Sequence, residues 1–217
     1  RLCETPHAAL WIPEYYDEIW HWTKDYPKLS SIATVGKGLE HLGKPSLPRG
    51  MRTVEARPFE GSIPGVASIE GDWGTHEQPR LEHFNLDPDS IRRPGSGADT
   101  GEPQVVLTHN PVARGIWRLK PFIDKVGRPV ASNFITVRPR ASAYPLEYLW
   151  ALCCSPFANA YIFTHSLKRN IHIGDVREMP IPNADTHSVN RVAGVAREYL
   201  EAAVAGVIRG LPKKVRK

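Results

Sequence analysis

The most regular pattern of apolar positions lies near the C-terminus. From Ser188 to Ile208, small and apolar residues recur every three or four positions, as on one face of a helix of about five turns. They are Val189, Val192, Ala196, Tyr199, Ala203 and Val207. A stripe this narrow predicts an amphipathic helix that packs against one other helix.

Shorter helices are predicted upstream of this one. Four residues after Pro145 occupy positions i, i+3, i+4 and i+7, which form one helical face; they are Leu146, Leu149, Trp150 and Cys153. Ser155 and Pro156 then suit the N-cap and first position of a second helix. The stretch "IGDVREMPIP" (173–182) predicts a single helical turn stopped by its two prolines.

The strand signals are short and separated by turn formers. The β-rich stretches are "LSSIATV" (29–35), "MRTVEARPF" (51–59), "PGVASIE" (64–70), "PQVVLTHNP" (103–111) and "RPVASNFITVRPR" (128–140). Residues 36–50 predict a long loop, and "DPDSIRRPGSGADTGEP" (87–103) an exposed one. Twenty prolines and seventeen glycines favour many short elements. We therefore predict a mixed α/β (α+β) fold of small sheets and short helices, followed by the long C-terminal helix.

Composition excludes several classes of protein. Hydrophobic residues make up 41% and charged residues 24%, and no apolar run approaches the ~20 residues of a membrane span. Three cysteines, two of them adjacent, do not form a secreted disulfide framework, so we expect a cytoplasmic protein. The chain begins at Arg1, and we expect it to be a piece of a longer polypeptide.

The net charge of +5 comes from the tail, because the last nine residues hold five basic side chains and no acid. Inside the body, residues 70–102 hold eight acids and three arginines, whereas residues 104–172 hold nine basic residues and two acids. Such segregation indicates either a positive face that attracts a polyanion or an uneven set of solvated loops.

One loop contains most of a phosphate-binding P-loop. In "VGKGLEHLGKPS" (35–46), Gly38 is followed after four residues by Gly43 and Lys44. A P-loop requires Ser or Thr after the lysine and a helix that begins there, but Pro45 follows Lys44 and blocks that helix. ATP binding is therefore not predicted. The loop's basic residues suit a sugar-phosphate backbone, or equally a solvated surface; they are Lys37, Lys44, Arg49 and Arg52.

Complete catalytic motifs are not found in the sequence. The cysteine and histidine spacings do not fit a zinc site, and Ser96 lacks the strand of a nucleophile elbow. His109-Asn110-Pro111 invites comparison with the N-P-P-[YF] loop of amino-methyltransferases, but Val112 replaces the second proline. We predict no metal, catalytic or cofactor site in this chain.

Several pieces, read in order, resemble one family. "WTKDYPKLSSIATVGKG" (22–38) resembles the opening of the target-recognition domain of type I restriction specificity subunits and related adenine-N6 DNA methyltransferases. "SNFITVRPRASAYPLEYLWALCCSPFANAYIF" (132–163) and "SLKRNIHIGDVREMPIP" (166–182) resemble its closing half. The chain departs from the family in having one such domain and helix where complete specificity subunits have two of each.

The resemblance implies that the chain recognises duplex DNA for a separate methyltransferase domain or subunit, which would hold S-adenosylmethionine and flip the target adenine. On this basis the expected phosphate contacts are Lys37, Lys44, Arg49, Arg118, Lys120, Lys168 and Arg169. The expected base-reading residues are His109 and Arg114.

The expected organisation is an N-terminal linker or helical segment (1–20), a DNA target-recognition domain (21–185), and a C-terminal helix with a basic tail (186–217). An alternative function is a protein-interaction scaffold that docks through the C-terminal helix. A hydrolase with an unusual Ser-His pair is a third possibility, with less support from the sequence.

Overall fold

The computed structural model describes residues 18, 20–70, 78–109, 118–166 and 170–204. Its main sheet has four strands in the order β1-β9-β7-β8, each antiparallel to its neighbours. The strands are β1 (Ala33–Lys37), β7 (Gln104–Thr108), β8 (Pro121–Asp124) and β9 (Phe134–Pro139). Runs of consecutive buried residues in β7, β8 and β9 are typical of strands covered on both faces.

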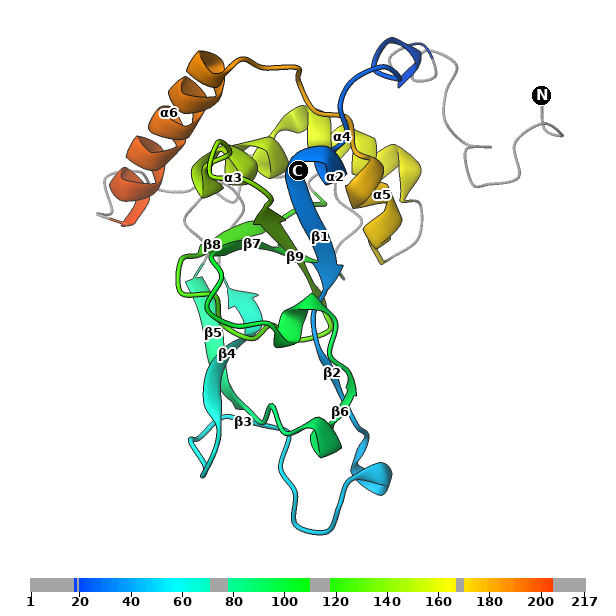
Figure 1. The fold of residues 1–217 in the computed structure, drawn as a ribbon, viewed down its shortest axis with the longest axis vertical. Helices are drawn as coiled ribbons and strands as arrows, with labels where there is room; N and C mark the ends of the chain where they lie inside the picture. Colours follow the sequence, from blue (N-terminus) through cyan, green and yellow to red (C-terminus); the bar gives the residue numbers. More distant parts are fainter. Residues whose placement is uncertain (1–17, 19, 71–77, 110–117, 167–169, 205–217) are drawn as a thin grey trace, which may run out of the picture.

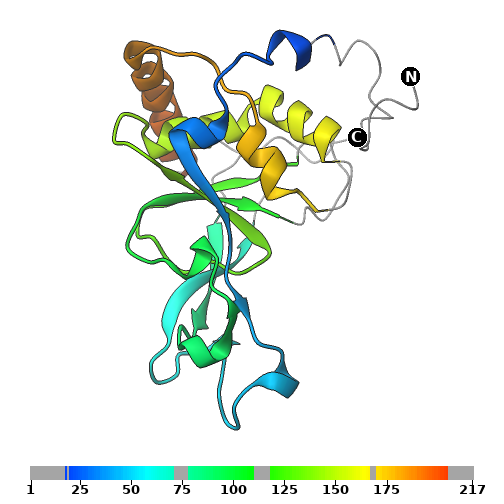
Figure 2. The ribbon, with the colours of Figure 1, turned by 45° about the vertical axis from the view of Figure 1, so that its right-hand side comes forward.

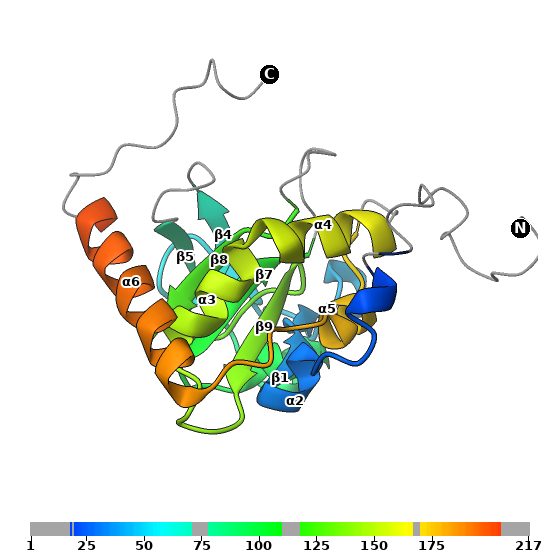
Figure 3. The same cartoon turned by 90° about the horizontal axis from the view of Figure 1, so that it is seen from above.

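Helices cover one face of this sheet, as the view in Figure 3 shows. They are α2 (Leu29–Ile32), α3 (Leu146–Cys154), α4 (Pro156–His165), α5 (Ile173–Glu178) and α6 (Thr186–Val204). The predicted cap of α4 is confirmed, because the Ser155 Oγ accepts a hydrogen bond of 3.0 Å from the Ala158 N–H. The mixed α/β fold predicted from the sequence is confirmed.

The predicted apolar stripe of α6 is divided between two directions. Val189, Ala193 and Ala196 are buried in the main core, and α6 packs against α3. Val192, from the predicted stripe, is 38% exposed, and Val195 is 63% exposed. The buried row therefore runs through small alanines, which allow the two helices to approach closely.

A second lobe extends from the sheet on the side away from the helices (Figures 1 and 2). It contains two small antiparallel sheets, β2-β6 and β3-β5-β4. Their strands are β2 (Glu40–His41), β3 (Val54–Glu55), β4 (Ile63–Glu70), β5 (Gln78–Phe84) and β6 (Ile91–Arg93). Short 3-10 turns lie between them: η2 (Lys44–Ser46), η3 (Pro88–Ser90) and η4 (Ser96–Ala98). We call this part the distal lobe.

A small apolar cluster joins the distal lobe to the main sheet. Val66 of β4 packs with Val106, Val130 and Phe134, and all four are buried. Isolated bridges between Leu39 and Ala131 and between Val66 and Val130 add backbone pairing at the same place. The lobes are therefore connected by packing and hydrogen bonds as well as by the chain.

Several local predictions were wrong. Residues 29–32, predicted as strand, form the helical turn α2, and β1 begins only at Ala33. The predicted loop 36–50 contains the end of β1 and all of β2. Strands β5 and β8 were not predicted; each forms by antiparallel pairing with the strand that precedes it in the chain, β4 and β7 respectively.

The stretch 87–103, predicted as an exposed loop, is mostly exposed, but it also contains β6 and is anchored to the main sheet around Ser96–Asp99. Arg138 of β9 is 6% exposed, and it donates hydrogen bonds to the Asp99 carboxylate (2.8 Å), the Ser96 carbonyl (2.7 Å) and the Gln104 side chain (3.0 Å). Gly97 is buried, and its carbonyl accepts from the Val130 N–H. A buried arginine with several acceptors thus orders a segment whose composition is typical of loops.

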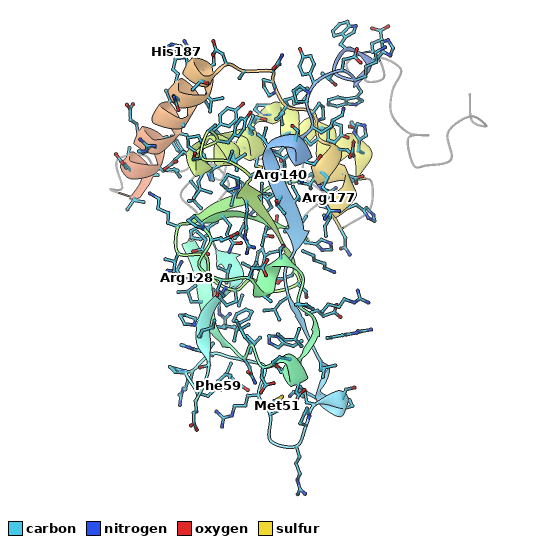
Figure 4. The ribbon with its side chains drawn as sticks, in the orientation of Figure 1. Met51, Phe59, Arg128, Arg140, Arg177 and His187 are labelled. Atoms are coloured by element: carbon cyan, nitrogen blue, oxygen red, sulfur yellow. The ribbon has the colours of Figure 1, made fainter. Side chains whose placement is uncertain are left out.

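The outer edge of β1 is covered by an arginine. Arg177 of α5, labelled in Figure 4, donates to the Val35 carbonyl from its Nε (3.0 Å) and Nη2 (2.8 Å). Because β1 is an edge strand, this carbonyl would otherwise face outward without a strand partner. Among the described residues, no helix has the length and apolar character needed to cross a membrane.

Candidate nucleic-acid interface

The most exposed basic segment of the distal lobe is the loop 42–53, which we call the basic loop. It contains Lys44, Arg49 and Arg52 and no acidic residue, and all three side chains are exposed. The basic loop lies at the end of the molecule farthest from the helices (Figure 1). Three uncompensated charges on a projecting loop favour contact with a polyanion.

The base of the basic loop is firmly held by Asn85. Its Nδ2 donates to the Arg52 carbonyl (2.9 Å) and its backbone N–H to the Thr53 carbonyl (2.7 Å). The Asn85 carbonyl in turn lies 2.8 Å from the Nε2 of His41. Burial lowers the pKa of His41, although the hydrogen bond to Asn85 partly opposes the shift. His41 is therefore an uncharged support for the loop at neutral pH.

The glycines beside Lys37 serve close packing between the lobes. A Cβ on Gly38 would collide with the Ala131 carbonyl. A Cβ on Gly95, whose φ is +51°, would likewise collide with the Lys37 carbonyl. Lys37 itself ends β1 and is half-buried. After Lys44 the chain forms only the 3-10 turn η2 and then extended backbone at Leu47, so the helix of a P-loop is missing here, as predicted.

Two exposed arginines of β6 were not identified from the sequence. Arg92 and Arg93 lie opposite Glu40 of β2, with nitrogen–oxygen distances of 3.1 Å and 3.8 Å to its carboxylate. Such exposed pairs contribute little to stability. They lie within segment 70–102, whose net charge is negative, so the charge pattern did not single them out. Only the β2-β6 pairing brings them to the same lobe as the basic loop.

A second group of predicted residues meets at the open end of the β7-β8 pair. Leu107 of β7 pairs with Pro121, the first residue of β8. His109 follows the end of β7 and Lys120 precedes the start of β8, so both lie at the same end of the strand pair. Both are half-buried. The His109 N–H donates to the Asn133 carbonyl at 2.9 Å. The fold thus brings together two candidates that are eleven positions apart in sequence.

Arg118, a predicted phosphate contact, is placed differently. It is 4% exposed, and its Nη2 donates to the Ser166 carbonyl at 3.3 Å. A guanidinium this buried supports the fold around the β7-β8 end and does not face solvent. The remaining candidates, Arg114, Lys168 and Arg169, lie outside the described residues.

The helical side of the molecule has an apolar groove between α3 and α6. Its volume is about 710 Å³, and we call it the α3-α6 groove. Its lining comprises Trp150, Ala151, Cys154, Ser155, Arg191, Val192, Val195, Ala196 and Tyr199. Trp150 and Tyr199 stack with ring centroids 6.0 Å apart. Exposed valines beside stacked aromatic rings are typical of surfaces that bind protein partners.

Cys153 is fully buried, and burial raises its pKa to about 12, so it remains a thiol. No group of three or more His, Cys, Asp or Glu side chains in the described part is arranged to hold a metal ion.

No protein-family model matches this sequence, and the curated proteins contain no match either. Among solved structures, the chain is similar to the crystal structure of the HsdS subunit from Thermoanaerobacter tengcongensis, with a TM-score of 0.47 and 15% sequence identity. The match covers 83% of this chain and 38% of that one. The chain thus spans well under half the length of that subunit.

Proposed function

We propose that this chain recognises duplex DNA in a sequence-specific way, as the C-terminal part of an adenine-N6 DNA methyltransferase or a restriction-modification enzyme. The observation that carries the proposal is the basic loop, whose three exposed cations project from a base held by Asn85. The family resemblance of residues 22–38 and 132–182 supports it independently.

The basic residues divide into two tasks in this proposal. Lys37, Lys44, Arg49 and Lys120 contact phosphates, which position the duplex and make affinity depend on salt. His109 contacts base edges, where sequence is read. Arg114, Lys168 and Arg169 keep their sequence-based roles in base reading and phosphate contact. Arg118 is no longer proposed as a phosphate-contacting residue, because its side chain is buried.

Methyl transfer belongs to another domain or subunit in this proposal. That partner supplies S-adenosylmethionine and the loop that grips the flipped adenine. The chain divides into the segments 1–20, 21–185 and 186–217, and the whole enzyme acts in the cytoplasm. The α3-α6 groove is the surface that receives the methyltransferase partner, because its apolar lining is exposed in this chain.

A titration of duplex DNA with the full chain between 20 and 200 mM NaCl tests the proposal. Wild type is expected to bind with a negative salt slope. Replacing Lys44 and Arg49 by alanine is expected to reduce the magnitude of that slope by about 1.8, since each lost phosphate contact contributes about 0.9.

The matched control replaces Lys24 and Arg140 by alanine. Both are exposed and lie outside the distal lobe, so this variant changes the net charge equally without touching the basic loop. An equal loss of slope in both variants contradicts a local contact. An absence of duplex binding by wild type at 20 mM NaCl overturns the proposed function.

The alternative function is a protein-interaction scaffold, which the α3-α6 groove favours. Duplex binding separates the two functions, and replacing Val192 and Val195 by glutamate tests the groove, because both side chains are already exposed and folding is little affected. The recognition module retains wild-type duplex binding in this variant and loses only assembly with its methyltransferase. A scaffold lacks duplex binding from the start.

A further inference from the structure

The β7-β8 end is held by a buried amide on a neighbouring helix. Asn159 of α4 is 1% exposed. Its Oδ1 accepts hydrogen bonds from the backbone N–H groups of Arg118 (2.7 Å) and Leu119 (2.8 Å). Its Nδ2 donates to the carbonyls of Cys153 (3.2 Å) and Ser155 (3.1 Å). All four hydrogen bonds available to the amide are therefore made.

The position of β8 explains why a side chain has this role. β8 is the last strand of the main sheet, and Arg118 and Leu119 lie just before its first residue, Pro121. Among the strands that the structure describes, none lies on the outer side of β8 to accept their N–H groups. Asn159 acts as that missing neighbour and fixes the backbone immediately before Lys120.

A second set of bonds ties the same end to the turn between α4 and α5. The buried Arg118 side chain donates to the Ser166 carbonyl. The Ser166 Oγ donates to Asp175 (2.6 Å) and accepts from the His172 N–H (3.0 Å). One residue before His172, the backbone meets the residue that follows β7, because the Ile171 N–H donates to the His109 carbonyl at 2.8 Å.

Asn159, Arg118, Ser166 and the His109–Ile171 bond together form what we call the α4 clasp. One of its hydrogen bonds, from Ile171, is made to the His109 carbonyl itself. Another, to Asn159, is made by the N–H of Leu119, the residue before Lys120. The clasp is buried, whereas the two residues that it holds are only half-buried. It therefore constrains the backbone beneath two side chains that remain accessible to a ligand.

We infer that Asn159 and Arg118 are positioning residues that hold Lys120 and His109 in the geometry needed to contact DNA. The inference rests on the proposed function. A long lysine side chain on a fixed backbone loses less conformational freedom on binding than one on a mobile backbone, so pre-organisation strengthens the phosphate contact. A packed apolar residue at position 159 would leave the two N–H groups unpaired and release that backbone.

The test measures the salt slope of duplex binding for wild type, Asn159→Ala, Lys120→Ala and the double variant, at a temperature where circular dichroism shows each to be folded. Lys120→Ala is expected to reduce the magnitude of the slope by about 0.9. Asn159→Ala is expected to reduce it by a similar amount. The double variant is expected to lose no more than about 0.9, because both changes remove the same contact.

The slope separates positioning from general stability. Partial unfolding lowers the fraction of active protein but leaves the number of phosphate contacts per bound molecule unchanged. Asn190→Ala on the exposed face of α6 is the matched control and is expected to keep the wild-type slope. Arg118→Met, which keeps the apolar stem, gives a second route to the clasp if Asn159→Ala does not fold.

Each outcome decides between the hypotheses. A folded Asn159→Ala or Arg118→Met variant with the wild-type slope shows that the clasp is only structural and overturns the inference, while the proposed function stands. Additive losses in the double variant also overturn it. If wild type binds no duplex at 20 mM NaCl, the proposed function fails and the inference fails with it.

Discussion

Replacing Asn159 by aspartate exchanges one nitrogen of the clasp for oxygen and turns two attractive hydrogen bonds into repulsive oxygen–oxygen contacts. The Oδ1 atom still accepts from the Arg118 and Leu119 N–H groups. The second oxygen, however, lies where Nδ2 donated to the Cys153 and Ser155 carbonyls, at 3.2 Å and 3.1 Å. At neutral pH a carboxylate oxygen therefore faces two carbonyl oxygens in a buried site.

The cost follows from these contacts. Two hydrogen bonds are lost, each contributing about 1 kcal/mol, and a carboxylate whose second oxygen faces two carbonyl oxygens is buried. Leaving a buried charge uncompensated costs about 3–5 kcal/mol. Bonds from the two N–H groups to a charged oxygen offset part of this. We expect N159D to lower the free energy of unfolding by about 3–5 kcal/mol at pH 7.

The pH dependence of this loss has a definite sign. Burial raises the pKa of the introduced carboxyl in the folded state above its unfolded value of about 3.9. The folded state then binds the proton more tightly, so the stability of N159D relative to wild type rises as the pH falls toward about 4. Once protonated, the acid donates to one of the two carbonyls and recovers one hydrogen bond.

Urea unfolding followed by tryptophan fluorescence at pH 7, 6, 5 and 4.5 measures the difference between N159D and wild type. N190D, at an exposed position of α6, is the matched control and is expected to stay within about 0.5 kcal/mol of wild type. A difference below about 1 kcal/mol at pH 7, or one that stays constant down to pH 4.5, would refute the geometry assigned to Asn159.

Three further predictions concern other parts of the fold. Arg138→Met should lower the free energy of unfolding by about 2–4 kcal/mol in urea unfolding, because the Gln104 side chain and the Ser96 carbonyl lose their buried donor; Arg140→Met, at the exposed neighbouring position, should have little effect. Gly38→Ala should lower the free energy of unfolding, measured by thermal unfolding, by about 2 kcal/mol or more, because the added Cβ collides with the Ala131 carbonyl. Its control is Gly174→Ala on α5, where the added Cβ meets no atom; this variant should leave stability unchanged or raise it by up to about 1 kcal/mol. Burial lowers the folded-state pKa of His165 below its unfolded value near 6.5, so wild type should lose stability as the pH falls through and below 6.5. In urea unfolding, His165→Phe should show a smaller decrease of the midpoint between pH 7 and pH 5. An equal decrease in both proteins contradicts this prediction.

The helical half of the molecule was readable from the sequence because its signals are local. The side chain of Ser155 caps α4 three residues away, and Pro156 suits the first position of that helix, so both act within one turn. The spacing after Pro145 likewise depends only on the helical repeat, and α3 follows it from Leu146 to Cys154. The β-branched runs of β7 and β9 were equally clear.

Much of the distal lobe was not readable in this way, although the predicted strand 64–70 is confirmed as β4 (Ile63–Glu70) and β3 lies within the predicted strand 51–59. β2, β3 and β6 have only two or three residues each, too few for an alternating pattern to be recognised. The segment 87–103 has the composition of a loop, and what orders it is Arg138, about forty positions away in sequence. Such bonds leave no trace in the sequence around the segment itself.

The sequence by itself determined which basic residues are available for the proposed DNA contacts, including Lys44, Arg49 and Arg52 in the acid-free segment 42–53. Only the tertiary structure decided which of them reach solvent together. It buried Arg118, brought His109 and Lys120 to one end of the β7-β8 pair, and bonded Asn159 to the backbone of the two residues before Lys120. The physical reason is that charge and helical period are local properties of a chain, whereas burial and strand pairing depend on residues far apart along it.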